Sequence, residues 1–119
     1  MQKETRTKIV GVTQGKDDGE ERQLNVSKLL AGQKLFIKLE DDNAFDPNAI
    51  KIFSDVDYKL PLGYLPRELA RDLRVLMARG NEYLFFVSGV TGGAGGKSFG
   101  CNIRIVLNSK DELNGGVNL

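Results

Sequence analysis

The sequence predicts a small, mainly β domain with helices: an OB-like β-barrel of about six short strands, with one main helix and one short helix. Three observations support this fold class. The chain has 119 residues, enough for one compact domain, and no internal repeat. About six short segments are rich in β-forming residues. Only residues 65–80 show the strong apolar periodicity of a helix.

The composition restricts the possible chemistry. The chain contains no His, which excludes imidazole bases and most zinc sites. The single cysteine, Cys101, excludes an internal disulfide and fits a reducing compartment. The sequence has neither an apolar run long enough to cross a bilayer nor a secretion signal. We therefore expect a cytoplasmic protein that makes no contact with a membrane.

The first third of the chain predicts two strands and the short helix. Residues 1–6 are expected to form a flexible N-terminus, and TRTKIVGVT (Thr5–Thr13) is rich in β-forming residues. The polar stretch 14–22 is predicted to be a loop. NVSKLLAGQ (25–33) is predicted to be the short helix, closed by a Gly. KLFIKLE (Lys34–Glu40) alternates apolar and polar residues, as a half-buried strand does.

The middle of the chain predicts two more strands and the main helix. A polar turn, Asp41–Asn48, leads to the strand AIKIF (Ala49–Phe53), and LPLGYL (60–65) is a further extended segment. The main helix follows, because Pro66 suits the first helical position and Gly80 suits the C-terminal cap. One face of this helix is apolar and is formed by Leu69, Leu73, Leu76 and Met77.

A mild excess of positive charge marks the second half. Residues 61–110 contain seven Lys or Arg and three Asp or Glu. Arg67, Arg71 and Arg74 follow one another at i, i+4 and i+7, so they share one face of the main helix. Taken alone, this stripe is better explained as a solvated helix surface than as a binding site.

A hairpin closes the predicted domain. NEYLFFVSGVTGG (81–93) and SFGCNIRIVL (98–107) are strands joined by a Gly-rich connection. GGAGGKS resembles a phosphate-binding loop, but that pattern needs Gly at Thr91 and a helix after the loop. Cys101 lies in an apolar strand and is expected to be buried. The domain is expected to cover residues 7–108, and residues 109–119 form a polar, Gly-rich tail or linker.

The turn Asp41–Asn48 is unusual because it holds an aromatic residue, Phe45, among three Asp and two Asn. It does not fit a calcium-binding EF-hand loop, which would need an acidic or amide residue at Phe45 and a Gly at Asp46. A looser Mg²⁺ site formed by Asp41, Asp42 and Asp46 stays open as an alternative. It would make the protein a metal-dependent nuclease or phosphatase.

The segment NAFDPNAIKI (43–52), which includes most of the turn, and the segment LGYLPRELA (62–70), about ten residues further along, are expected to pack side by side. Together they offer two aromatic residues, Phe45 and Tyr64, beside a helix with a basic face. Rings that stack on bases and cations that neutralise phosphates are typical of single-stranded nucleic-acid binding. The helix start also offers N–H groups that suit an anion. The rival interpretation is that Phe45 and Tyr64 are core residues and that Asp46, Pro47 and Asn48 form a plain turn.

The strings DDNAFDPNAIKI, LGYLPRELA and GCNIRIVL, in this order, closely resemble the HIRAN domain family over roughly Thr7–Leu107. The resemblance implies an OB-like barrel that captures the free 3′-hydroxyl end of single-stranded DNA. Such domains occur alone in bacteria and phages, or fused to Snf2-type helicase-like ATPases that remodel stalled replication forks. The member that binds 3′ ends has a second stacking aromatic after its first strand. Here Thr13 and Gln14 stand in that region, so the clamp on the base would be one-sided.

The resemblance also implies roles for individual residues. Phe45 would stack on the terminal base, and Asp46 would accept a hydrogen bond from the 3′-OH. Asn43 would lie near the same end, Asn48 would brace the loop, and Lys51 would meet a phosphate. The complete set of predicted DNA-binding residues is Gln14, Asn43, Phe45, Asp46, Asn48, Lys51, Tyr64, Arg67 and Arg71.

We therefore predict a module that binds single-stranded DNA, at its free 3′-OH end, in DNA repair or replication-fork processing. Tyr64 would form the pocket edge, while Arg67 and Arg71 would contact the DNA backbone. The module would have no catalytic residues, metal or other cofactor, and any ATPase activity would belong to a helicase-like partner in cis or in trans. The alternatives are the Mg²⁺-dependent nuclease or phosphatase and a protein-interaction domain that uses a barrel edge or the Gly-rich hairpin.

Overall fold

The computed structural model describes residues 3–13 and 19–108. This part of the chain forms six strands and two helices, and a single 3-10 turn at Ala94–Gly96 joins the last two strands. The elements are β1 (Glu4–Lys8), α1 (Gly19–Ser27), β2 (Lys34–Leu39), β3 (Ile50–Phe53), β4 (Pro61–Tyr64), α2 (Arg67–Ala78), β5 (Tyr83–Gly92) and β6 (Phe99–Leu107).

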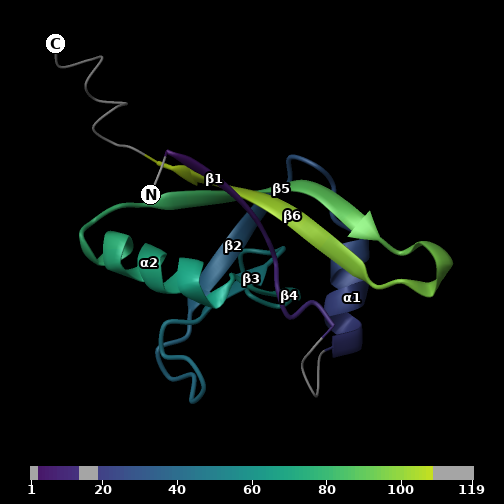
Figure 1. The fold of residues 1–119 in the computed structure, drawn as a ribbon, viewed down its shortest axis with the longest axis horizontal. Helices are drawn as coiled ribbons and strands as arrows, with labels where there is room; N and C mark the ends of the chain where they lie inside the picture. The colour runs from purple at the N-terminus through teal and green to yellow at the C-terminus, as the bar shows by residue number, and fades with distance from the viewer. Residues whose placement is uncertain (1–2, 14–18, 109–119) are drawn as a thin grey trace, which may run out of the picture.

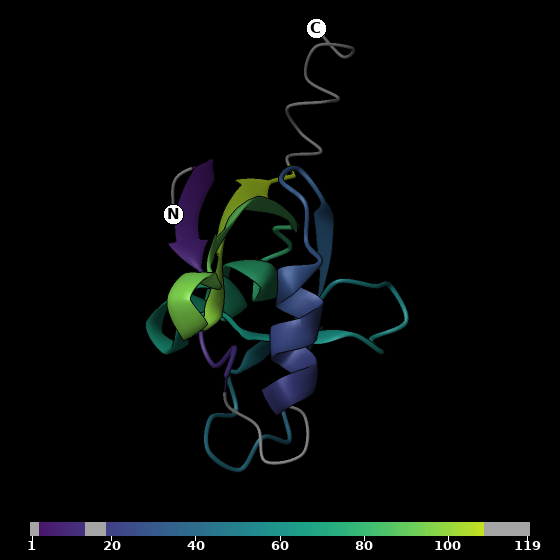
Figure 2. The ribbon, with the colours of Figure 1, turned by 90° about the vertical axis from the view of Figure 1, so that its right-hand side faces the viewer.

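All six strands form one antiparallel sheet in the order β1-β6-β5-β2-β3-β4. The sheet is strongly curled (Figures 1 and 2), and β5 and β6 form a long hairpin whose tip extends beyond the rest of the domain (Figure 1). Helix α1 packs against β4 and β6. The predicted mainly β fold of about six strands with one longer and one shorter helix is therefore confirmed.

The two edges of the sheet meet at Val10 and Tyr64. Just after β1, Ile9 N still donates to Cys101 O on β6 (3.0 Å), whereas Val10 exchanges two backbone hydrogen bonds with Tyr64 on β4 (2.8 and 2.9 Å). This close approach needs a glycine on β4. Gly63 has a φ of +148°, and a Cβ there would lie 2.4 Å from Val10 O. The segment that follows the first edge strand is thus joined to the other edge.

The core consists of buried apolar side chains from the strands and both helices. Its fully or almost fully buried members are Ile9, Val26, Leu29, Leu35, Ile50, Ile52, Leu62, Leu65, Ala70, Leu73, Phe85, Val87, Cys101, Ile103 and Ile105. Neither helix in the described ranges has the length and apolar character needed to traverse a lipid bilayer.

Helix α1 lies earlier in the chain than predicted. The sequence patterns favour a helix at 25–33, but the structure has it at Gly19–Ser27, so that it begins within the stretch 14–22 that was expected to be a loop. Two glutamates in its first turn suit the helix dipole. Its buried side is partly polar, because Arg22 and Asn25 are buried and donate to backbone carbonyls far away in the sequence. Apolar spacing alone could not reveal such a helix.

The N-terminal boundary also differs from the expected one. Residues 4–6, expected to be flexible, belong to β1, because the backbone from Glu4 to Lys8 pairs with β6 from Val106 to Asn102. The strand predicted at 5–13 therefore begins one residue earlier, at Glu4, and already ends at Lys8. The predicted tail at residues 109–119 lies outside the described residues, as does Gln14.

The remaining elements lie within a few residues of their predicted bounds. In α2, Pro66 is the N-cap rather than the first helical residue, and Leu73 is fully buried on the predicted apolar face. Gly80 has the positive φ, +96°, that favours Gly after a helix. Cys101 is buried, as predicted, and burial raises the pKa of its thiol to about 11.

Replacing Gly63 with Ala is expected to lower the free energy of unfolding by more than about 2 kcal/mol, because the new Cβ would collide with Val10 at an unfavourable φ. Urea denaturation measures this change. Gly89→Ala is the matched control, since a Cβ added there meets no described atom within 4 Å. If both variants unfolded at the same urea concentration, the joining of the sheet edges would not depend on Gly63.

Candidate nucleic-acid interface

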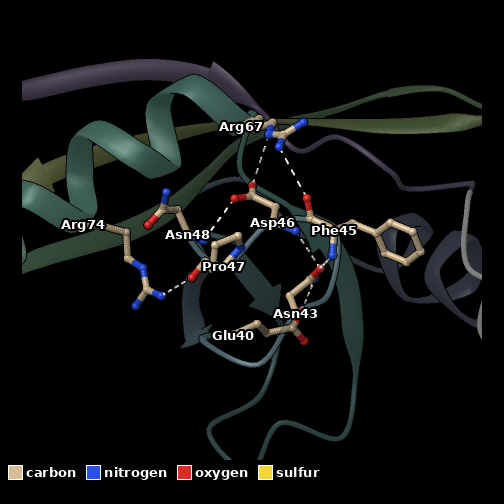
Figure 3. A network of polar contacts seen from close by, with 8 residues as sticks. All are labelled: Glu40, Asn43, Phe45, Asp46, Pro47, Asn48, Arg67 and Arg74. Carbon is tan, nitrogen blue, oxygen red and sulfur yellow. Dashed lines mark hydrogen bonds and ion pairs between the residues drawn. The ribbon is translucent and has the colours of Figure 1, made fainter.

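The loop between β2 and β3 is folded around the side chain of Asn43 (Figure 3). The Oδ1 of Asn43 accepts hydrogen bonds from the backbone N–H groups of Phe45 (2.9 Å) and Asp46 (3.0 Å). Its Nδ2 donates to Glu40 Oε1 (3.1 Å). At the base of the loop, Glu40 N donates to Ala49 O (2.9 Å). The amide of Asn43 therefore fixes the backbone conformation that carries Phe45.

Tyr64 connects this loop to the junction between the sheet edges. Its hydroxyl donates to Glu40 Oε1 (2.8 Å), the same oxygen that Asn43 contacts. Two cations lie near its ring, with the guanidinium carbon of Arg22 at 5.5 Å and Lys51 Nζ at 5.7 Å from the centroid. Tyr64 is partly buried in the sheet, and its hydroxyl supports the loop from there. Two positive charges lie beside its ring.

Arg67 connects the start of α2 to the centre of the loop. Its Nη2 donates to Phe45 O (3.3 Å), and its Nε lies 3.7 Å from Asp46 Oδ2. The other carboxylate oxygen of Asp46 accepts a hydrogen bond from Asn48 N (3.0 Å), which makes a local turn. The Asp46 side chain is 18% exposed. Asp46 and Asn48 thus brace the loop, while part of the carboxylate reaches the surface next to Phe45.

Arg74 attaches the loop to the next turns of α2. It donates to Pro47 O (2.7 Å) and forms an ion pair with Asp41, and its side chain is only 15% exposed. Together with Arg67, two of the three arginines on the basic face of α2 therefore contact the loop. The interpretation of this face as a solvated helix surface is wrong for Arg74, which is largely covered by the loop, whereas Arg67 contacts the loop and still has a side chain that is 75% exposed. Arg71, between them, is exposed.

Phe45 itself is presented to solvent. Its side chain is 91% exposed, and its ring points away from the polar network that holds its backbone (Figure 3). Burying a Phe side chain would stabilise a fold by roughly 1.5–3 kcal/mol. The exposed Phe45 ring does not contribute this stabilisation, although hydrogen bonds with Asn43 and Arg67 hold the loop backbone. The interpretation of Phe45 as a core residue is therefore wrong.

The carboxylates of the loop do not form a metal site. Asp41 is paired with Arg74 and Asp46 with Arg67, so arginines occupy the neighbourhood that a cation would need. Within residues 3–13 and 19–108, no group of three His, Cys, Asp or Glu side chains could hold a metal ion. These contacts weigh against the alternative of a Mg²⁺-dependent nuclease or phosphatase.

Most of the predicted site residues come together. Those on the loop or in contact with it are Asn43, Phe45, Asp46, Asn48 and Arg67. Tyr64 on β4 is linked to the loop through Glu40, and Lys51 on β3 lies near the Tyr64 ring. Sequence reasoning did not single out Glu40 or Arg22. Their only signals were a charge at the end of a strand and a charge in a polar stretch.

Comparison with known proteins agrees with this architecture. The model of the HIRAN domain family matches residues 2–109. The HIRAN domain of human HLTF has a similar structure, with a TM-score of 0.62, 20% identity, and coverage of 96% of this chain and 82% of that chain. A protein from Lactobacillus plantarum is also similar, with a TM-score of 0.57, 18% identity, and coverage of 87% and 98% respectively. No curated protein matches significantly. The likeness to the HLTF domain supports the predicted OB-like fold.

Replacing Asn43 with Ala is expected to lower the free energy of unfolding by about 1–3 kcal/mol, since two loop N–H groups lose their acceptor. The amide hydrogens of Phe45 and Asp46 should then exchange with solvent faster, which NMR-detected hydrogen exchange measures. Asp42→Ala, at the exposed neighbouring position, is the matched control. Unchanged exchange at both amides in the Asn43 variant would show that the loop holds its shape without this side chain.

Proposed function

Because the chain belongs to the HIRAN domain family, which is generally a DNA-binding family, we propose that it recognises single-stranded DNA at a free 3′-hydroxyl end. The exposure of Phe45 is the observation that carries this proposal. A ring that is 91% exposed, on a loop fixed by hydrogen bonds and by α2, is a rigid platform for a base. A stacked base contributes roughly 1–3 kcal/mol, whichever base it is.

The proposal assigns the terminal hydroxyl to Asp46, the next residue along the loop. An ionised carboxylate accepts a hydrogen bond from a 3′-OH and repels a 3′-phosphate, so one group would distinguish the two ends. Arg67 contacts Asp46 and remains exposed enough to meet the DNA backbone. Arg71, on the exposed surface of α2, would extend these phosphate contacts.

Only one ring would hold the base. Thr13 stands in the region where the 3′-end-binding relative has a second aromatic, and Gln14 lies outside the described residues. We therefore propose a one-sided clamp, in which stacking on Phe45 is supplemented by electrostatic contacts. In the cell, such a module would act in DNA repair or replication-fork processing. Any ATP-driven step would come from a helicase-like partner, in cis or in trans.

Two short oligonucleotides test this function, identical except for a 3′-OH or a 3′-phosphate. The wild type is expected to prefer the 3′-OH strand. Phe45→Ala should weaken binding of that strand roughly 5- to 150-fold, the loss of one stacked base. Asp46→Ala should reduce the preference between the two ends, because the carboxylate that repels the phosphate is gone. Fluorescence anisotropy at fixed salt measures both effects.

Leu30→Ala is the matched control for Phe45, because Leu30 is a large, highly exposed apolar residue outside the loop. It should bind as the wild type does. Equal binding of the two strands by the wild type would contradict recognition of the 3′-OH. Wild-type affinity of the Phe45 variant would contradict stacking on this ring.

A further inference from the structure

A second basic surface lies on the sheet, formed by β1, β6, β5 and β2. These four strands contain five basic residues, Arg6, Lys8, Lys34, Lys38 and Arg104, and a single acidic residue, Glu4. The strand pairing aligns Arg6 with Arg104, Arg104 with Phe86, and Phe86 with Lys34. Directly paired residues lie on the same face of a sheet. One row across four strands therefore holds three cations and an aromatic ring.

The contacts within this row leave it positively charged. Arg104 lies over the Phe86 ring, with its guanidinium carbon 4.8 Å from the centroid, and it pairs with Glu4 at 3.1 Å. Glu4 also lies 3.9 Å from Arg6, whose side chain is 78% exposed. One carboxylate is thus shared by two arginines. Lys8 and Lys34 are exposed on the same face and add two further charges.

Two adjoining hollows form a groove along β1 and the segment that follows it. Its first part, about 450 Å³, is lined by Arg6, Thr7, Lys8, Ser88, Asn102 and Ile103. A second hollow of about 370 Å³ shares Lys8 and Asn102 with the first and continues along residues 9–13. Within that second stretch Val10 pairs with Tyr64, which supports the Phe45 loop through Glu40. The groove therefore extends from the basic face to Val10, the residue whose backbone pairs with Tyr64 on β4.

We propose that this surface, the β1–β6 groove, binds the phosphodiester backbone of the DNA strand whose 3′ end the Phe45 loop captures. The inference rests on the proposed function and deepens it, because it assigns a path to the nucleotides that precede the end. Arg6 and Lys8 are two residues apart on β1, hence about 7 Å apart. Successive phosphates of an extended single strand are separated by a similar distance. The hydroxyl and amide groups of Thr7, Ser88 and Asn102 add hydrogen-bond donors to the groove.

Oligonucleotide length separates this surface from the end site. The double variant Arg6→Gln/Lys8→Gln is expected to weaken binding of a strand of about 16 nucleotides by about tenfold, and to leave a strand of about 4 nucleotides unaffected. Its plot of log affinity against log salt for the longer strand should be less steep by about 1.4, the effect of two lost phosphate contacts. Both strands end in a 3′-OH.

The control variant Lys28→Gln/Lys59→Gln removes the same charge from exposed lysines outside the groove, so it should bind both strands as the wild type does. The proposal is overturned if the groove variant binds the longer strand normally, if both lengths weaken alike, or if the control weakens equally.

Phe45→Ala distinguishes failure of the proposed function from failure of this inference. This variant should bind both the shorter and the longer strand more weakly than the wild type does. If Phe45→Ala has no effect while the groove variant weakens only the longer strand, the groove stands and end capture fails. If the wild type binds neither strand, both proposals fail.

Discussion

The backbone pair between Val10 and Tyr64 is the constraint on which the rest of the structure depends. It joins the two edges of the sheet, and it is possible only because Gly63 has no side chain where Val10 approaches. The same pair fixes Tyr64, whose hydroxyl reaches Glu40 at the base of the exposed loop. Tyr64 therefore takes part both in joining the sheet edges and in supporting the candidate site.

From that base, the loop is held almost entirely by its own polar groups and by α2. Asn43 satisfies two backbone N–H groups inside the loop, and Arg67 and Arg74 contact its carbonyls and carboxylates from the helix. The side chain that this scaffold presents, Phe45, contributes little to folding, because it is almost fully exposed. Rigid backbone beneath an exposed ring lowers the entropy lost when a ligand binds, which favours recognition.

Sequence patterns predicted those parts of the fold in which local periodicity and burial agree. The strands β2 and β3 and the helix α2 have clear apolar faces, so their bounds were predicted within a few residues. Helix α1 was misplaced, since its buried side includes Arg22 and Asn25, whose partners lie far along the chain. The sequence indicated that Phe45 and Arg67 belong to the same site, but it left open whether the Phe45 ring is exposed or buried. Long-range polar contacts have no local signature.

A single stacking ring limits what the loop can achieve alone. One stacked base contributes roughly 1–3 kcal/mol and one hydrogen bond to a charged group about 1.5–3 kcal/mol, whereas micromolar affinity corresponds to about 8 kcal/mol. Two of the helix arginines already contact the loop, so they are not fully available to phosphates. If the loop captures a DNA end as proposed, most of the remaining affinity would come from cations outside the loop. The excess positive charge along β1 and β6 lies where a bound strand that continues from the Tyr64 junction would meet it. In the proposed arrangement the loop would select the DNA end, and the sheet would supply the salt-dependent part of the affinity.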